Sequence, residues 1–159
     1  PSGRCEFFSE GLAAIGLNGL PDHVPNHEPA GSDARYPLAM ISPPARNFLN
    51  STFVNVQSLR DIEGEPLLEI GEADALARGI SSGDVVRVFN DRGSYLCKAA
   101  VSPRARPGVV NGLGIWWRKL GLDGTNVNEV TSQRLTDLGR GPVFYDCLVQ
   151  VAPLASGRA

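Results

Sequence analysis

The chain has 159 residues, enough for one domain to bury about 70% of the surface that its unfolded form exposes. Its 42% hydrophobic and 20% charged residues exclude intrinsic disorder, and no apolar run approaches the ~18 residues of a membrane span. The net charge of −2 disfavours a nucleic-acid partner, because domains that bind nucleic acids usually carry a basic stripe.

The first segment of the chain predicts an extended start and a short amphipathic helix that ends at or near Gly16. Residues 17–35 are rich in proline, glycine and polar side chains, which is the composition of a surface arm. His23 and His27 stand four residues apart, but Pro25 prevents the helix that would align them as metal ligands. We therefore expect a short helix and an irregular arm over residues 1–35, followed by one compact domain over residues 36–153.

The compact domain begins with a predicted buried strand over residues 36–42 and a loop over residues 42–55. This loop, SPPARNFLNSTFVN, offers hydroxyl and amide side chains around Phe48 and Phe53, namely those of Ser42, Asn47, Asn50, Ser51 and Thr52. It suits an extended ligand with heteroaromatic rings and phosphate, since amides bind ring edges and hydroxyls bind oxyanions. The alternative is that Asn50, Ser51 and Thr52 only cap a helix that begins near Thr52.

A short strand is predicted over residues 67–70, and the following EADALARGI predicts a helix that Gly79 ends. Four of its residues share one helical face, namely Ala73, Leu76, Ala77 and Ile80. Nothing in this region indicates an acid–base pair, so a solvated acidic face is the favoured interpretation of its carboxylates. These are Glu63, Glu65, Glu69, Glu72 and Asp74.

Residues 81–101 alternate in polarity around a tight turn at 90–93, which predicts a β-hairpin. Its apolar positions are Val86, Val88, Tyr95, Cys97, Ala99 and Val101. Further short strands are expected from Gly108 and over residues 144–153, and residues 154–159 are expected to fray. Six or so short strands with one or two short helices predict a mainly β fold, a barrel more than a sandwich.

Two later segments combine polar and aromatic residues, GLGIWWR at 112–118 and GTNVNEVT at 124–131. Adjacent Trp116 and Trp117 should point to opposite sides of an extended chain, so that one packs inside and the other faces a ligand or partner. Asn126 and Asn128 fit either turn formation or ligand contact, and the residues themselves favour turns.

The cysteines Cys5, Cys97 and Cys147 form no zinc or iron–sulfur motif and are expected to be reduced and buried. The sequence contains no phosphate-binding loop, no Rossmann fingerprint and neither of the G-x-S-x-G and H-E-x-x-H motifs. Independent catalysis is not expected, and no catalytic residue or metal ligand is assigned.

Four segments, taken in order, form a pattern over residues 36–151: SPPARNFLNSTFVN, LEIGEADALARGISSGDVVRV, GIWW and NVNEVTSQRLTDLGRGPVFYDCLVQV. The pattern resembles the C-terminal dinucleotide-binding domain of molybdopterin oxidoreductases related to dimethyl sulfoxide reductase and formate dehydrogenase. The block A-x-x-x-G-I-x-x-G-D-x-V-R-V is shared by other double-psi barrels. LNSTF before it, and NEVT and D-x-G-x-G-P-x-F-Y-D after it, are more specific.

The resemblance implies a double-psi β-barrel that binds a guanine dinucleotide arm of bis(molybdopterin guanine dinucleotide), with molybdenum or tungsten. Many relatives have a histidine where this chain has Asn50 and a lysine near Tyr145. We expect Asn50, Ser51, Asn128 and Tyr145 to line one face of the barrel. The residues at the family's cofactor-contact positions are Ser42, Pro43, Asn50, Ser51, Thr52, Trp117, Asn128, Asp137 and Tyr145.

The resemblance also places the metal ligand in an earlier domain, so the isolated chain should show no turnover. Residues 1–35 would be the tail of that catalytic domain, and the partners would be the preceding domains of the same polypeptide, with an iron–sulfur cluster as a further expectation. Two alternatives stay open. One is a separate small subunit, as in formylmethanofuran dehydrogenases. The other is a protein-interaction module without cofactor, using Trp116, Trp117 and the acidic stretch from Asp61 to Asp74. The cellular compartment is left open, with cytoplasm favoured over periplasm.

Overall fold

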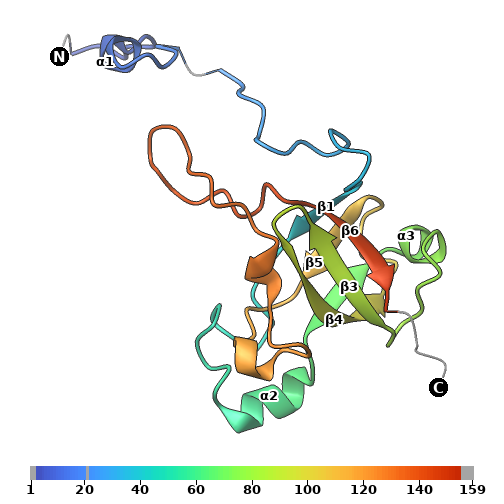
Figure 1. Ribbon diagram of the computed structural model, residues 1–159. Helices are drawn as coiled ribbons and strands as arrows, with labels where there is room; N and C mark the ends of the chain where they lie inside the picture. The colour runs from blue at the N-terminus through green and yellow to red at the C-terminus, as the bar shows by residue number, and fades with distance from the viewer. Residues whose placement is uncertain (1–2, 21, 155–159) are drawn as a thin grey trace.

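The computed structural model describes residues 3–20 and 22–154, and its centre is a closed six-stranded β-barrel (Figure 1). The strands neighbour one another in the order β1-β5-β2-β4-β3-β6. The β1–β5 and β2–β4 pairs are parallel and the others antiparallel, which confirms the mainly β, double-psi barrel expected from the sequence. The strands are β1 (Leu38–Ile41), β2 (Leu67–Ile70), β3 (Val85–Asn90), β4 (Gly93–Val101), β5 (Val109–Gly112) and β6 (Leu148–Pro153).

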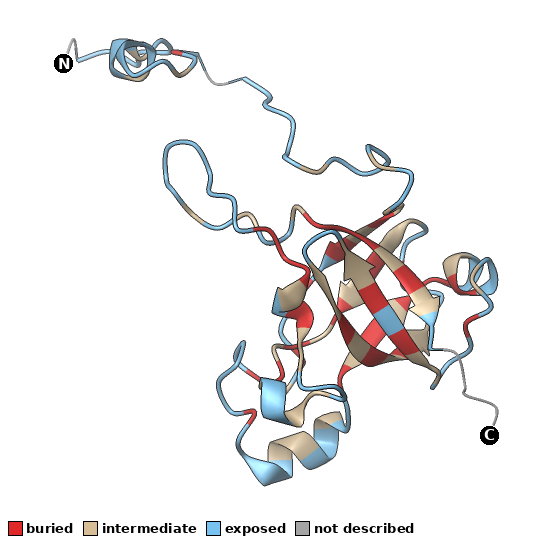
Figure 2. Cartoon of the chain, in the orientation of Figure 1, coloured by how far each residue is buried: buried red, intermediate tan, exposed pale blue. Residues whose placement is uncertain are grey.

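The barrel interior is filled by alternating side chains, as period-two strands require. In β4 the buried positions are Tyr95, Cys97 and Ala99, with partly exposed residues between them, and Figure 2 shows the same alternation around the barrel. Leu68 and Ile70 of β2 are 0% exposed because they belong to the core inside the barrel, whereas Glu69 between them is partly exposed. The hairpin predicted from polarity alternation is confirmed, with Asn90 opposite Gly93 across a two-residue turn.

Three short α-helices lie outside the barrel, α1 (Glu10–Ala14), α2 (Gln57–Glu63) and α3 (Glu72–Leu76), together with two 3-10 turns, η1 (Arg118–Leu120) and η2 (Val127–Glu129). Helix α1 confirms the predicted first helix, and Gly16 follows it with a φ of 83°. The predicted face of α3 is wrong. Ala75 and Ile80 are buried, whereas Leu76 is 82% exposed, because the helix is a single turn that contacts the barrel through Ala75.

Two further expectations need correction. Strand β6 begins at Leu148 and not at residue 144, because residues 143–146 form a turn closed by the Asp146 N–H donating to the Val143 carbonyl at 3.0 Å. The carboxylates expected to be solvated are engaged in four cases, one of which is the ion pair of Glu65 with Lys98. Glu69 accepts from Asn111 Nδ2 at 2.8 Å, Asp74 accepts from the Gly108 N–H at 2.7 Å, and Glu63 accepts from Asn47.

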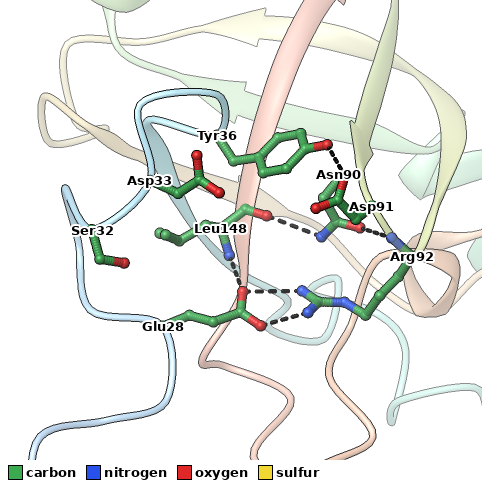
Figure 3. A pocket seen from close by; sticks show the side chains of 8 residues that line it. All are labelled: Glu28, Ser32, Asp33, Tyr36, Asn90, Asp91, Arg92 and Leu148. Carbon is green, nitrogen blue, oxygen red and sulfur yellow. Dashed lines mark hydrogen bonds and ion pairs between the residues drawn. The ribbon is translucent and has the colours of Figure 1, made fainter.

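The arm, which runs from residue 17 to residue 35, is tied to the barrel at its far end, around the β3–β4 turn (Figure 3). The Glu28 carboxylate pairs with Arg92 and accepts from the Leu148 N–H at 2.8 Å. Tyr36 Oη donates to Asp91 at 2.6 Å, and Arg35 pairs with the same carboxylate at 3.0 Å. An open cleft of about 290 Å³ between the arm and the barrel is lined by Glu28, Tyr36, Asp91, Arg92 and Leu148, among others.

The contacts of the Glu28 carboxylate with Arg92 and the Leu148 N–H, which tie the arm to the barrel, should be sensitive to acid. Burial raises the pKa of this carboxyl, but the hydrogen bonds from Arg92 and the Leu148 N–H outweigh it and lower the pKa below the ordinary 4.5. A lowered folded-state pKa contributes stability above about pH 4.5 that is lost as the pH falls through the folded value. An NMR titration from pH 6 to pH 3 should therefore move the Leu148 amide signal as the arm loosens. Glu28→Gln should abolish this pH-dependent shift of the Leu148 amide signal. An identical titration profile in the variant would contradict the role of Glu28 in holding the arm.

The three cysteines differ in burial. Cys97 and Cys147 are buried as expected, but Cys5 is exposed because the segment before α1 does not pack on the barrel. Burial raises the pKa of Cys97 to about 12 and that of Cys147 to about 11. At pH 8 a thiol reagent should therefore modify one thiol of the folded chain rapidly and three after denaturation. Rapid modification of two or three in the folded chain would contradict this.

Candidate functional site

The two polar-aromatic segments meet at one end of the barrel because of how β1 and β5 are paired. These strands are parallel neighbours, with Ile41 opposite Asn111, so the loops that follow them leave the barrel at the same end. The Gly114 N–H donates to the Pro43 carbonyl at 2.9 Å, which joins the two loops at their start. Ser42, next to Pro43, is 8% exposed.

A small second core holds these loops together beyond the barrel. Phe48 and Trp116 meet edge to face with ring centroids 5.2 Å apart. Gly114 has a φ of 79° and lies so close to Ala45 that a Cβ would stand 3.2 Å from the Ala45 Cβ. The buried members are Ala45, Phe48, Val54 and Trp116, with Leu59, Leu113, Trp117 and Leu120 packed against them.

The two tryptophans point to opposite sides, as predicted. Trp116 is 6% exposed inside the second core, whereas Trp117 is partly exposed, donates from Nε1 to the Ser51 carbonyl at 2.8 Å and lies under Lys119 Nζ at 5.0 Å. Burial of Trp116 removes it from the exposed surface that the protein-interaction alternative required. The ammonium group of Lys119 adds a positive charge to a site for which the sequence predicted uncharged hydroxyl and amide side chains.

Residues 49–52 form a tight turn. The Leu49 and Thr52 backbones exchange hydrogen bonds of 3.1 and 2.9 Å. Asn50 has a φ of 52° and Phe53 a φ of 75°, in the left-handed region that non-glycine residues rarely adopt. Such conformations cost of the order of 1–3 kcal/mol each and persist only where the surrounding structure enforces them.

The side chains of this turn are available to a ligand. Asn50, Ser51 and Thr52 are exposed, and their side chains take part in no hydrogen bond within residues 3–20 and 22–154. The alternative that they cap a helix near Thr52 is wrong. Helix α2 begins at Gln57, its N-cap residue is Val56, and no side chain caps it.

Asn128 is brought to the same region through its neighbour. Asn126 Nδ2 donates to the Trp116 carbonyl at 2.9 Å, and Asn126 Oδ1 accepts from the Asn128 N–H at 3.0 Å. Asn126 is therefore a turn former, as the residues favoured. The Asn128 side chain is exposed and has no hydrogen-bond partner in the described part of the chain.

Asp137 and Tyr145 lie elsewhere, on a loop over residues 133–146 that projects from the barrel toward the arm (Figure 1). Asp137 accepts from its neighbour Leu138 at 2.6 Å, and the Tyr145 ring packs on Phe144. Asp146, at the base of this loop, accepts from the His27 N–H of the arm at 3.0 Å. No contact in the described residues links this loop to the 49–52 turn. Asn50 and Ser51 thus share one turn and Asn128 is linked through Asn126 to Trp116, the neighbour of the Trp117 that contacts this turn, while the convergence of all four residues on one face stays a prediction.

Sequence reasoning missed the helix that holds the turn. Glu63 Oε1 of α2 accepts from the Asn47 N–H at 2.5 Å and from Asn47 Nδ2 at 2.7 Å, and Arg60 Nη1 donates to the Val54 carbonyl at 2.7 Å. The Glu63–Asn47 contact joins residues 16 apart in sequence, which no local pattern reveals. The described residues contain no cluster of three or more potential metal ligands, and none of their helices is long and apolar enough to cross a membrane.

Comparison with known proteins gives consistent matches. A family model described as "Molydopterin dinucleotide binding domain" matches residues 38–148. The probable oxidoreductase YoaE of Bacillus subtilis is 37% identical over 95% of this chain and 22% of its own length. Dimethyl sulfoxide reductase DmsA of Escherichia coli is 35% identical over 95% of this chain and 20% of its own length.

A solved structure shares the fold. Acetylene hydratase from Pelobacter acetylenicus aligns with a TM-score of 0.80 at 18% identity, over 97% of this chain and 24% of that protein. The chain thus spans about a fifth of the length of the curated relatives YoaE and DmsA.

Proposed function

Because this chain belongs to the molybdopterin dinucleotide-binding domains of the dimethyl sulfoxide reductase family, we propose that it binds a guanine dinucleotide arm of bis(molybdopterin guanine dinucleotide) in a molybdenum oxidoreductase. The bound metal centre supplies the redox chemistry. The residues of this chain bind and orient the dinucleotide at the end of the barrel where the 42–55 and 113–128 segments meet.

The observation that carries the proposal is the 49–52 turn. It combines an enforced backbone with free hydroxyl and amide side chains, next to Trp117 and Lys119. Hydroxyl groups and an ammonium group suit a diphosphate, because hydrogen bonds to a charged oxygen are stronger than neutral ones. Amides such as Asn50 and Asn128 offer both a donor and an acceptor, as the edge of a guanine ring requires.

The finer parts of the proposal concern the longer protein. The curated relatives carry the matching segment within chains about five times longer. We propose that residues 1–35 are the tail of a preceding catalytic domain of the same polypeptide and that this domain covers the dinucleotide from the other side. Tungsten in place of molybdenum, and an iron–sulfur cluster in that part, remain proposals of the same kind.

Nucleotide binding by the isolated chain tests the proposal. GDP contains the guanine, ribose and diphosphate of the dinucleotide arm, so calorimetric titration should detect it with a Kd on the order of 1 mM, about −4 kcal/mol. The affinity is expected to be low because one wall of the site is absent from this chain. CDP has the same ribose and diphosphate and serves as the matched control. The proposal would be overturned if GDP and CDP bound equally well, or if neither bound at a concentration about 10-fold above the expected Kd.

A further inference from the structure

Helix α2 reaches both ends of the 49–52 turn without contributing a residue to the barrel. From its last turn, Glu63 accepts two hydrogen bonds from Asn47, just before the turn. From its middle, Arg60 donates to the Val54 carbonyl, just after the turn. None of the residues of α2 is buried, and Leu59, which is partly buried, packs against the second core, so the helix is held by this apolar contact together with the polar contacts of Glu63 and Arg60.

A third contact fixes the middle of the turn from a different element. Trp117 Nε1 donates to the Ser51 carbonyl at 2.8 Å, and Trp117 is itself packed against the second core. The backbone from Asn47 to Val54 is therefore held before, within and after the turn by side chains from α2 and from the segment after β5.

The backbone of this segment needs such support. Asn50 and Phe53 are two of the three non-glycine residues with positive φ in the described chain, and they flank Ser51 and Thr52. A bulky residue such as Phe53 leaves the left-handed region readily unless its surroundings prevent it. Loss of the holding contacts would let the turn relax and disperse the side chains of Asn50, Ser51 and Thr52.

We propose that Glu63 and Arg60 are positioning residues of the dinucleotide site. They contact the loop and not the ligand, and they keep the 50–52 side chains in the arrangement that binds it. Preorganisation of this kind raises affinity by reducing the ordering that binding requires. The identity of the ligand rests on the proposed function, whereas the contacts of Glu63 and Arg60 with the loop do not.

Two measurements on Glu63→Ala test the proposal, with Asp61→Ala as the matched control. Asp61 is an acid of the same helix that contacts only Gln57 in the described residues, so both variants lose one charge and one helical side chain. In Glu63→Ala we expect the Leu49 and Thr52 amide protons to exchange at least about tenfold faster and GDP to bind about tenfold more weakly. Asp61→Ala should leave the exchange rates and the GDP affinity unchanged. Glu63→Gln retains an acceptor, so it should restore most of the amide protection and most of the GDP affinity.

Unchanged amide exchange in Glu63→Ala would overturn the proposal, and so would faster exchange with unaltered GDP affinity. If Glu63→Ala does not fold, Arg60→Met removes the other contact while keeping an unbranched side chain, and the same two outcomes apply. Absence of GDP binding by the unmodified chain would refute the proposed function, and the exchange rates alone would then decide whether α2 holds the turn.

Discussion

Replacing Leu68 by alanine is expected to lower the free energy of unfolding by about 2–5 kcal/mol. Leu68 is 0% exposed and lies on β2, which is paired with β4 on one edge and β5 on the other. The neighbouring strands are fixed by their hydrogen bonds, so the barrel has little freedom to close the resulting cavity. Denaturant unfolding of the variant should show a lower midpoint with an unchanged slope.

Leu76→Ala is the matched control, since it removes the same atoms from a side chain that is 82% exposed. We expect it to change the free energy of unfolding by no more than about 0.5 kcal/mol. The pair also tests the corrected position of α3, because helical periodicity in the sequence places Leu76 on the same face as Ile80. Equal losses in the two variants would contradict the structure.

Replacing Asn50 by glycine is expected to weaken GDP binding by about 10- to 100-fold. This corresponds to roughly 1.5–3 kcal/mol, which is typical of losing a hydrogen bond to a charged group or of leaving a polar group of the ligand without its partner. Glycine is the informative substitution because Asn50 has a φ of 52°, which glycine adopts without strain. The backbone of the turn is thereby retained while the amide side chain is removed. Calorimetric titration with GDP measures the effect.

Asn55→Ala provides the comparison for Asn50→Gly. Asn55 is an exposed amide on the same loop, and the described residues show no hydrogen bond to its side chain. It should bind GDP as the unmodified chain does. A loss of affinity in Asn55→Ala equal to that in Asn50→Gly would show that the loop responds to any change and that Asn50 has no specific part in binding.

Much of the barrel was predictable because its strands carry the alternation that half-buried sheets require. Residues 67–70 and the hairpin around residues 90–93 were placed correctly, and the closed barrel followed from the number of short strands. Helices were harder to predict. Helix α2 has no capping side chain, and the buried face of α3 is set by its contact with the barrel and not by periodicity over five residues.

The candidate site was predictable in composition but not in geometry. The polar loops at residues 42–55 and 112–131 are evident in the sequence, and the resemblance identified Asn50, Ser51 and Thr52 within them. The contacts that hold them are non-local, such as Trp117 to Ser51 across 66 residues. The parallel pairing of β1 with β5, which brings the two loops to one end, depends on topology that the sequence does not display.

The location of the ligand is the most direct test of the proposed function. An isotope-labelled chain titrated with GDP should show its largest amide shifts over residues 42–55 and 113–131, with Ser51, Thr52 and Asn128 among them. The β3–β4 turn and α3, which lie outside these segments, should stay unmoved. Shifts concentrated at the β3–β4 turn or at α3, with the 49–52 turn unaffected, would contradict the assignment of the dinucleotide site.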